Sequence, residues 1–221
     1  MPTVRDIKDK LNEQFARIGH ALSSPKRLEL LELLHQCEKS VETLVANTGM
    51  TIANTSRHLQ VLRGAGLVET RREGIYVFYR LADGQVYDLV SNMKKVAQSR
   101  LAEVERVLSD ITDDPKEVEI IDRNKLLKLA KGGKIIMLDV RPEDEYAAEH
   151  IPHALSIPLD KLKSHLDRLP QGQQIVAYCR GPYCVLAGEA VRVLRSKGFE
   201  AIRLGDGVAE WKAAGMPVVH G

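Results

Sequence analysis

Leucines recur at helical spacing near the start of the chain and predict an amphipathic helix over residues 25–36, through Leu28, Leu31, Leu33 and Leu34. Ser24 and Pro25 are residue types that suit the cap and the first turn of this helix. The first apolar face of the chain is therefore expected to belong to a helical domain.

Two shorter helical patterns follow. The segment 41–49 predicts a short helix ended by Gly49, since glycine commonly ends helices. Thr51 is expected to cap the next helix, in which Leu59 and Leu62 face inward. Two helices joined by a tight turn are the helix-turn-helix pattern.

Apolar and polar residues alternate in the segment VETRREGIYVFYRL, residues 68–81, on both sides of Glu73-Gly74. This alternation around a turn predicts a β-hairpin. A helix-turn-helix followed by a basic hairpin is a winged helix, whose second helix can enter the major groove of DNA. A long helix is expected at 86–108.

The pattern changes in the second half, where short Val/Ile-rich runs alternate with amphipathic helices. Apolar runs at 134–140 and 173–179 are typical of buried parallel strands. The fold class expected is two domains: a mainly α winged helix-turn-helix, then an α/β domain with a central, mostly parallel sheet. Asp113, Asp114 and Pro115 mark the boundary. We expect domains at 1–110 and 118–221, joined by a linker at 111–117.

Composition and charge limit the classes of protein to which the chain can belong. The chain has 221 residues, 44% of them hydrophobic, and a net charge of +2. Its apolar runs are too short to span a bilayer and its N-terminus has no apolar signal region, so we expect a cytoplasmic protein without membrane contact. Three cysteines are too few for a disulfide framework. Residues 51–80 carry five arginines against two glutamates, which gives this segment a local positive charge.

SPKRLELLELL (24–34), TSRHLQVLRGAGLV (55–68) and the hairpin together resemble the ArsR-type family of winged-helix repressors, over about residues 15–85. The resemblance implies a homodimer, joined through the first helix and the helix at 86–108, on a double-stranded DNA operator with an imperfect palindrome. Asparagine can read adenine and arginine can read guanine in the major groove. The residues expected on the groove-facing side of the recognition helix are Ala53, Asn54, Arg57 and His58.

Phosphate contact or plain solvation remains an equal alternative for Arg57 and His58. Arg71 and Arg72 on the wing are expected to touch the DNA backbone or minor groove. Ser40 and Glu42 stand where the family's metal-sensing members have cysteines, and 86–108 contains no histidine. We therefore expect no metal site and no cofactor.

Cys179 stands at the carboxyl end of the second predicted strand, where α/β sheets bind ligands. Backbone N–H groups of the following turn and helix can point at an anion and lower the pKa of a thiol. The turn is predicted to be a loop that binds a substrate or an anion, formed by Arg180, Gly181, Pro182 and Tyr183.

The segments DVRPEDEYAAEHIPHA (139–154), CRGPYC (179–184) and GDGVAEW (205–211) together resemble the rhodanese (sulfurtransferase) family. The resemblance implies that the Cys179 thiolate attacks a sulfane-sulfur donor, forms a persulfide and passes the sulfur to an acceptor. Active members commonly carry an arginine where this chain has Cys184, so thiosulfate is a weaker fit. Cys184 is either a second thiol that resolves the persulfide or a small buried residue.

Other polar residues near these motifs are expected to be structural. Asp139 and Arg141 are interpreted as an ion pair at a strand end, His150 and His153 as turn residues, and Trp211 as a core residue. The favoured function is a DNA-binding regulator whose second domain senses or carries reactive sulfur on Cys179. The alternative is an active sulfurtransferase fused to a DNA-binding domain without signalling between them, so enzymatic turnover stays open. A third possibility is a repressor whose rhodanese-like domain is inert and serves only for dimerisation or for binding a partner.

Overall fold

A computed structural model describes residues 1–109 and 122–221 of the chain. The contacts divide the chain into two compact units, Met1–Val96 and Ala97–Gly221. The linker expected at 111–117 lies outside the described residues, so the predicted domain boundaries stay predictions.

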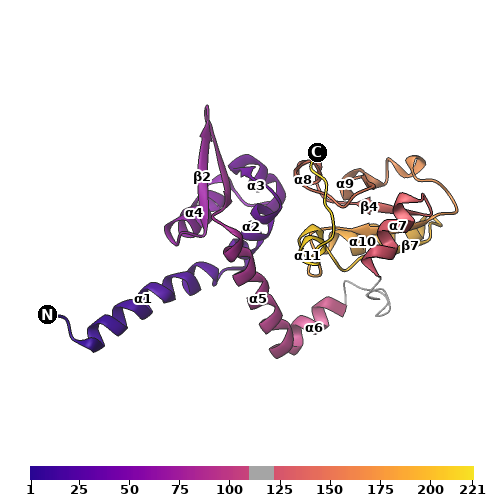
Figure 1. Ribbon diagram of the computed structural model, residues 1–221. Coiled ribbons are helices and arrows are strands. Elements are labelled where there is room, and N and C mark those ends of the chain that lie inside the picture. The colour runs from indigo at the N-terminus through magenta and orange to yellow at the C-terminus, as the bar shows by residue number, and fades with distance from the viewer. Residues whose placement is uncertain (110–121) are drawn as a thin grey trace. The chain divides into compact units, whose positions relative to one another are not determined.

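The first unit contains helices and a small antiparallel sheet (Figure 1). Its elements are α1 (Val4–Leu22), α2 (Pro25–Gln36), β1 (Lys39–Ser40), α3 (Val41–Thr48), α4 (Ile52–Gly64), β2 (Val68–Glu73), β3 (Tyr76–Leu81) and the start of α5 (Gly84–Arg100). Helix α3, the turn and helix α4 confirm the predicted helix-turn-helix.

Local side-chain chemistry sets the ends of these helices. Gly49 follows α3 with φ +65°, a left-handed conformation that glycine adopts without strain. The Thr51 hydroxyl accepts a hydrogen bond from the Asn54 N–H and so caps α4, as expected. Ser24 occupies the cap position of α2, but its side chain makes no capping bond there. Ser24 thus holds the predicted cap position, with Pro25 in the first turn, and contributes no side-chain bond.

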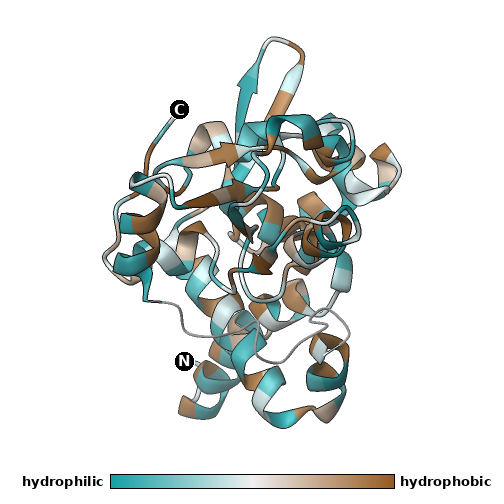
Figure 2. Ribbon diagram, turned by 90° about the vertical axis from the view of Figure 1, so that its right-hand side faces the viewer, coloured by the Kyte–Doolittle hydropathy of each residue, from teal (hydrophilic) through white to brown (hydrophobic). Residues whose placement is uncertain are grey.

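Strands β2 and β3 form the predicted hairpin, which pairs Val68 with Leu81 and Glu73 with Tyr76. The sheet order is β1-β3-β2. The hairpin projects beyond the helices that support it (Figure 1), and β2 is mostly hydrophilic (Figure 2). Its base is anchored because Val68 and Tyr79 are buried in the same apolar core as the leucines of α2 and α4. The projecting part is therefore a solvated wing on an apolar base.

The helix expected at 86–108 is interrupted. Helix α5 ends at Arg100 and α6 runs from Ala102 to Ser109. The Leu101 N–H still bonds to the Ala97 carbonyl, whereas the Val104 N–H bonds to the Leu101 carbonyl three residues back. A local tightening from i→i−4 to i→i−3 hydrogen bonding causes the break. The segment contains neither proline nor glycine, which explains why the sequence pattern did not reveal it.

The second unit contains a four-stranded sheet in the order β5-β4-β6-β7, with every neighbouring pair parallel. The strands are β4 (Ile135–Asp139), β5 (Ala154–Ser156), β6 (Gln174–Tyr178) and β7 (Ala201–Arg203). The helices are α7 (Arg123–Lys131), α8 (Glu143–Ala148), α9 (Leu159–Leu162), α10 (Leu186–Ser196) and α11 (Val208–Ala213), with a short 3-10 turn at Leu166–Arg168. The predicted α/β fold class is confirmed.

Alternate residues of β6 enter two separate apolar cores. Ile175 and Ala177 pack with α10 on one face, whereas Val176 and Tyr178 pack with Trp211 of α11 on the other. A strand buried on both faces explains the continuous apolar run in the sequence. The strand delivers the next residue, Cys179, to the carboxyl edge of the sheet.

Candidate thiol site and DNA-binding surface

Helix α4 presents a polar face. Ala53, Asn54 and Arg57 are exposed and His58 is half-buried, while Thr55, Leu59 and Leu62 of the same helix are buried against the core. The four residues expected to read DNA thus share the outer side of the helix. Burial, with the charges of Arg27 and Arg57, lowers the pKa of His58 and so favours its neutral imidazole.

Two of the wing arginines have carboxylate partners. Arg71 contacts Glu38 at 2.7 Å and Glu73 at 2.6 Å, and its guanidinium lies 4.8 Å from the centre of the Phe78 ring. Arg80 pairs with Glu69 at 2.7 Å. The positive charge counted from the sequence is therefore partly neutralised, and Arg71 must exchange carboxylates for phosphate in order to meet DNA.

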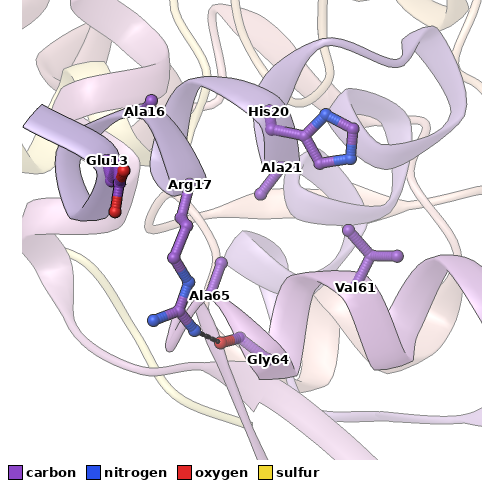
Figure 3. A pocket seen from close by; sticks show the side chains of 8 residues that line it. All are labelled: Glu13, Ala16, Arg17, His20, Ala21, Val61, Gly64 and Ala65. Atoms are coloured by element: carbon purple, nitrogen blue, oxygen red, sulfur yellow. Dashed lines mark hydrogen bonds between the residues drawn. The ribbon is translucent and has the colours of Figure 1, made fainter. Parts of the chain in front are cut away.

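An open groove of about 520 Å³ lies between α1 and the end of α4 (Figure 3). Most of the residues that line the groove are small and apolar. The Arg17 guanidinium crosses it and donates a hydrogen bond of 2.7 Å to the Gly64 carbonyl, the last residue of α4. This bond ties the first helix to the end of the helix expected to read DNA.

The thiol site forms where β6 ends and α10 begins. Cys179 is 1% exposed and Cys184 is 5% exposed, so both sulfurs lie inside the protein. Between them, Gly181 has φ +134°, which a residue with a side chain rarely adopts. A Cβ on Gly207 would lie 2.5 Å from the Arg180 carbonyl carbon, so glycine is needed there for the two loops to approach.

The two thiols share a hydrogen bond. The Cys179 S–H lies 3.6 Å from the Cys184 carbonyl oxygen and also within hydrogen-bond reach of the Cys184 sulfur. That bond, with the backbone N–H groups of Arg180 and Leu186, lowers the pKa of Cys184 to about 7. Burial raises the pKa of Cys179, although the Ala187 N–H and Arg203 act in the opposite direction.

This arrangement corrects one expectation. Loop and helix N–H groups do surround the sulfurs, as predicted, but in the dithiol they favour the anion at Cys184 and not at Cys179. The reason is that Cys184 accepts more hydrogen bonds, including the one from Cys179. The pKa of Cys184 is thus lowered and that of Cys179 raised, so Cys184 loses its proton more readily than Cys179.

The predicted loop residues have different roles in the structure. The Arg180 side chain is held by the Glu145 carboxylate at 2.8 Å, so a carboxylate already occupies part of its fork. The Pro182 carbonyl accepts a hydrogen bond of 2.6 Å from Arg203, and Tyr183 is half-buried. The side-chain charge of Arg180 is paired with a carboxylate, and both this charge and the Arg180 backbone N–H lower the pKa of Cys184.

Sequence reasoning missed Glu145 and Arg203. Glu145 is fully buried on α8, and Arg203 is 4% exposed at the end of β7. Arg203 stands at an inward position of a strand whose other buried position is Ala201. The sequence did contain one indication of Arg203: it is a charged residue at a strand position that is expected to be apolar. A buried charged residue needs a specific partner.

The residues interpreted as structural are confirmed in that role. Arg141 and Asp139 form a buried bidentate ion pair at 2.7 Å, and Trp211 is fully buried. His153 has φ +65° in a turn, as predicted, whereas His150 lies in a β-bridge with Val219 and not in a turn, and its ring bonds to the Tyr146 carbonyl. Among residues 1–109 and 122–221, no group of three or more His, Cys, Asp and Glu side chains is arranged to hold a metal ion. None of the helices in these ranges has the length and apolar character needed to cross a membrane.

Comparison with known proteins identifies both halves. Residues 24–70 match the family "Bacterial regulatory protein, arsR family", and residues 122–214 match the "Rhodanese-like domain". The "HTH-type transcriptional regulator Rv0324" of Mycobacterium tuberculosis is 44% identical over 216 residues, which cover 98% of this chain and 95% of that protein. The "HTH-type transcriptional regulator CmtR" of Mycobacterium bovis is 38% identical over 81 residues, covering 37% of this chain and 69% of its own.

Among solved structures, one NMR structure is of the "homodimeric winged helix-turn-helix DNA-binding domain" of Mb0332 from Mycobacterium bovis. It is 42% identical, covers 46% of this chain and 94% of its own chain, and has a TM-score of 0.42. The similarity to Rv0324, by contrast, extends through both matched domains.

Proposed function

The chain belongs to the ArsR-type helix-turn-helix transcriptional regulators that carry a C-terminal rhodanese-like domain, and from this premise we propose that it senses or carries reactive sulfur as a persulfide on Cys179. The observation that supports the proposal most is the buried pair of Cys179 and Cys184 in one loop, where the Cys179 thiol donates a hydrogen bond to the Cys184 carbonyl at 3.6 Å. Such a pair suits a cytoplasmic regulator whose signal is a change in sulfur oxidation state.

The first step is the uptake of sulfur. The donor is a persulfide R–S–SH, and the Cys184 thiolate takes the proton from Cys179 as the Cys179 sulfur attacks the terminal sulfur. A bond forms between Cys179 and that sulfur, the S–S bond of the donor breaks, and R–S⁻ leaves with the electron pair. The products are the Cys179 persulfide, the protonated Cys184 thiol and a thiolate.

The second step uses Cys184. Its sulfur attacks the Cys179 sulfur and displaces the outer sulfur, which leaves as H₂S together with the protons of the persulfide and of Cys184. A disulfide between Cys179 and Cys184 remains; the two thiols have been oxidised and the sulfane sulfur has been reduced. The persulfide places an added sulfur atom inside the loop and the disulfide joins the two sulfurs, so either state can act as the signal.

Binding to DNA is proposed through a homodimer. Helix α1 exposes apolar side chains at helical spacing, with Val4 86%, Ile7 49%, Leu11 48% and Phe15 66% exposed. One continuous apolar stripe on a helix calls for a partner surface, and a second copy of this helix supplies one. Each protomer would then present its α4 face and its wing to one half-site of the operator.

The experiment is an affinity measurement. A duplex selected from a random library by the reduced protein serves as the operator, and affinity is measured at one fixed salt concentration with and without a polysulfide donor. We expect donor treatment to change the affinity by at least about tenfold. The change is expected to vanish in Cys179→Ser and to persist in Cys37→Ser, a matched variant of a cysteine in the other unit.

Unchanged affinity, with mass spectrometry showing sulfur on Cys179, would reject the switch. The same sample, tested for repeated sulfur transfer to a small thiol, would then measure the alternative, an active sulfurtransferase without signalling to DNA. A response that survives in Cys179→Ser would contradict the assignment of this cysteine.

A further inference from the structure

Arg203 contacts the backbone of the loop that joins Cys179 to Cys184. It is the last residue of β7, pairs in register with Ala177 and is 4% exposed. One guanidinium nitrogen donates to the Pro182 carbonyl at 2.6 Å and to the Cys184 carbonyl at 3.3 Å. The side chain therefore fixes the loop between the two cysteines.

The charge of Arg203 is not balanced in the way that the other buried charges of this unit are. Arg141 is paired with Asp139 at 2.7 Å, and Arg180 is paired with Glu145 at 2.8 Å. Within the described ranges, Arg203 forms no ion pair, and its buried Nε has no hydrogen-bond acceptor there. Proteins rarely bury a cation without an anion nearby, because the loss of hydration must be offset.

The anion that fits is the sulfur pair. The charge of Arg203 favours the ionised form of Cys179, as the charge of Arg180 favours that of Cys184, and the Arg203 guanidinium donates to the backbone carbonyl of Cys184. The carboxylates near the loop are otherwise engaged: Glu145 binds Arg180, and Asp139 binds Arg141. Glu210 accepts a hydrogen bond from the Gly207 N–H and lies against Gly181.

We propose that Arg203 is a positioning residue that supplies a counter-charge at the thiol site, so that its guanidinium stabilises a thiolate formed there. Arg203 holds the loop carbonyls through hydrogen bonds and stabilises the thiolate through its charge. This proposal rests on the proposed function in one respect: it takes the thiolate to be the group that reacts with sulfur.

The test is a pH titration of the full-length reduced protein, followed by the ultraviolet absorbance of the thiolate. Arg203→Met removes the charge at similar size, and Arg203→Lys keeps a charge but not the fork. Arg195→Met is the matched control, because Arg195 also donates to a β7 carbonyl, that of Ala201 at 2.9 Å. Fluorescence of Trp211, the single tryptophan of the chain, reports whether each variant is folded.

We expect Arg203→Met to raise the midpoint of thiolate formation by at least about one pH unit, a tenfold loss of thiolate at a given pH. Arg203→Lys is expected to raise it less, and Arg195→Met not at all. The proposal is overturned if the two Met variants have the same midpoint, or if Arg203→Lys shifts it as far as Arg203→Met does.

A second measurement applies if Arg203→Met does not fold. The free energy of unfolding is compared between the wild type and a variant with both Cys179→Ser and Cys184→Ser. A thiolate with a lowered pKa stabilises the folded state above its midpoint, so the advantage of the wild type should grow as the pH rises through that midpoint. An advantage that stays constant with pH overturns the proposal. Neither measurement involves DNA or sulfur transfer, so failure here leaves the proposed function to its own test.

Discussion

The ion pair between Glu145 and Arg180 should make a large contribution to the stability of the second unit. The Glu145 carboxylate accepts hydrogen bonds of 2.8, 2.9 and 3.2 Å from Arg180. The side chain of Glu145 is 0% exposed and that of Arg180 is 13% exposed. Glu145→Gln would leave the guanidinium buried without its anion, a change that costs about 3–5 kcal/mol.

The assay is urea unfolding followed by the fluorescence of Trp211, which lies in the core of this unit and is the single tryptophan of the chain. With a urea dependence of about 1–3 kcal/mol per molar, the midpoint should fall by at least about 1 M. Adding Arg180→Met to Glu145→Gln should recover part of the loss, because no buried charge is then left alone.

The matched control is Glu189→Gln. Glu189 pairs with Arg192 at 3.3 Å, and their side chains are 53% and 40% exposed, so the loss should stay below about 1 kcal/mol. If Glu145→Gln lowers the midpoint no more than Glu189→Gln does, the pair at the loop is screened like a surface pair and the reasoning is wrong.

Three further predictions concern the wing and the loop. Glu38→Gln should release Arg71 from one of its two carboxylates and so favour contact with phosphate. This should strengthen binding to a duplex of arbitrary sequence and steepen its salt dependence by up to about one unit; an unchanged slope contradicts this. Because hydrogen bonds lower the pKa of Cys184 to about 7, thiolate absorbance should rise as the pH rises through that value and be lost there in Cys184→Ser; a midpoint at the ordinary thiol pKa contradicts this. Gly207→Ala places a Cβ 2.5 Å from the Arg180 backbone and should destabilise the unit by about 1–3 kcal/mol in the urea assay; a wild-type midpoint refutes the close approach.

Much of the fold was predictable because short-range patterns determine it. The leucines of α2 repeat every three or four residues, and the apolar run of β6 is buried on both faces of the sheet. The place of Cys179 followed from the same pattern, since it is the residue after that strand. Local periodicity was enough for these elements because each one buries its own apolar face.

The electrostatics of the site were not predictable in the same way. Glu145 lies 35 positions from Arg180, and Glu38 lies 33 positions from Arg71. Such pairs depend on which strands are neighbours and in which register, and no local pattern contains that information. Which cysteine carries the anion depends on how many N–H and S–H groups face each sulfur, and this is a property of the folded loop.

The central claim is that sulfur on Cys179 changes the affinity for DNA, and the most direct measurement compares bound and free protein in one sample. Reduced protein receives less polysulfide than it can consume and is mixed with a limiting amount of operator duplex. The bound and free pools are then separated, and mass spectrometry measures the fraction of modified Cys179 in each. The account predicts at least about a tenfold difference in the ratio of modified to reduced protein between the pools. Equal ratios in the two pools would contradict it.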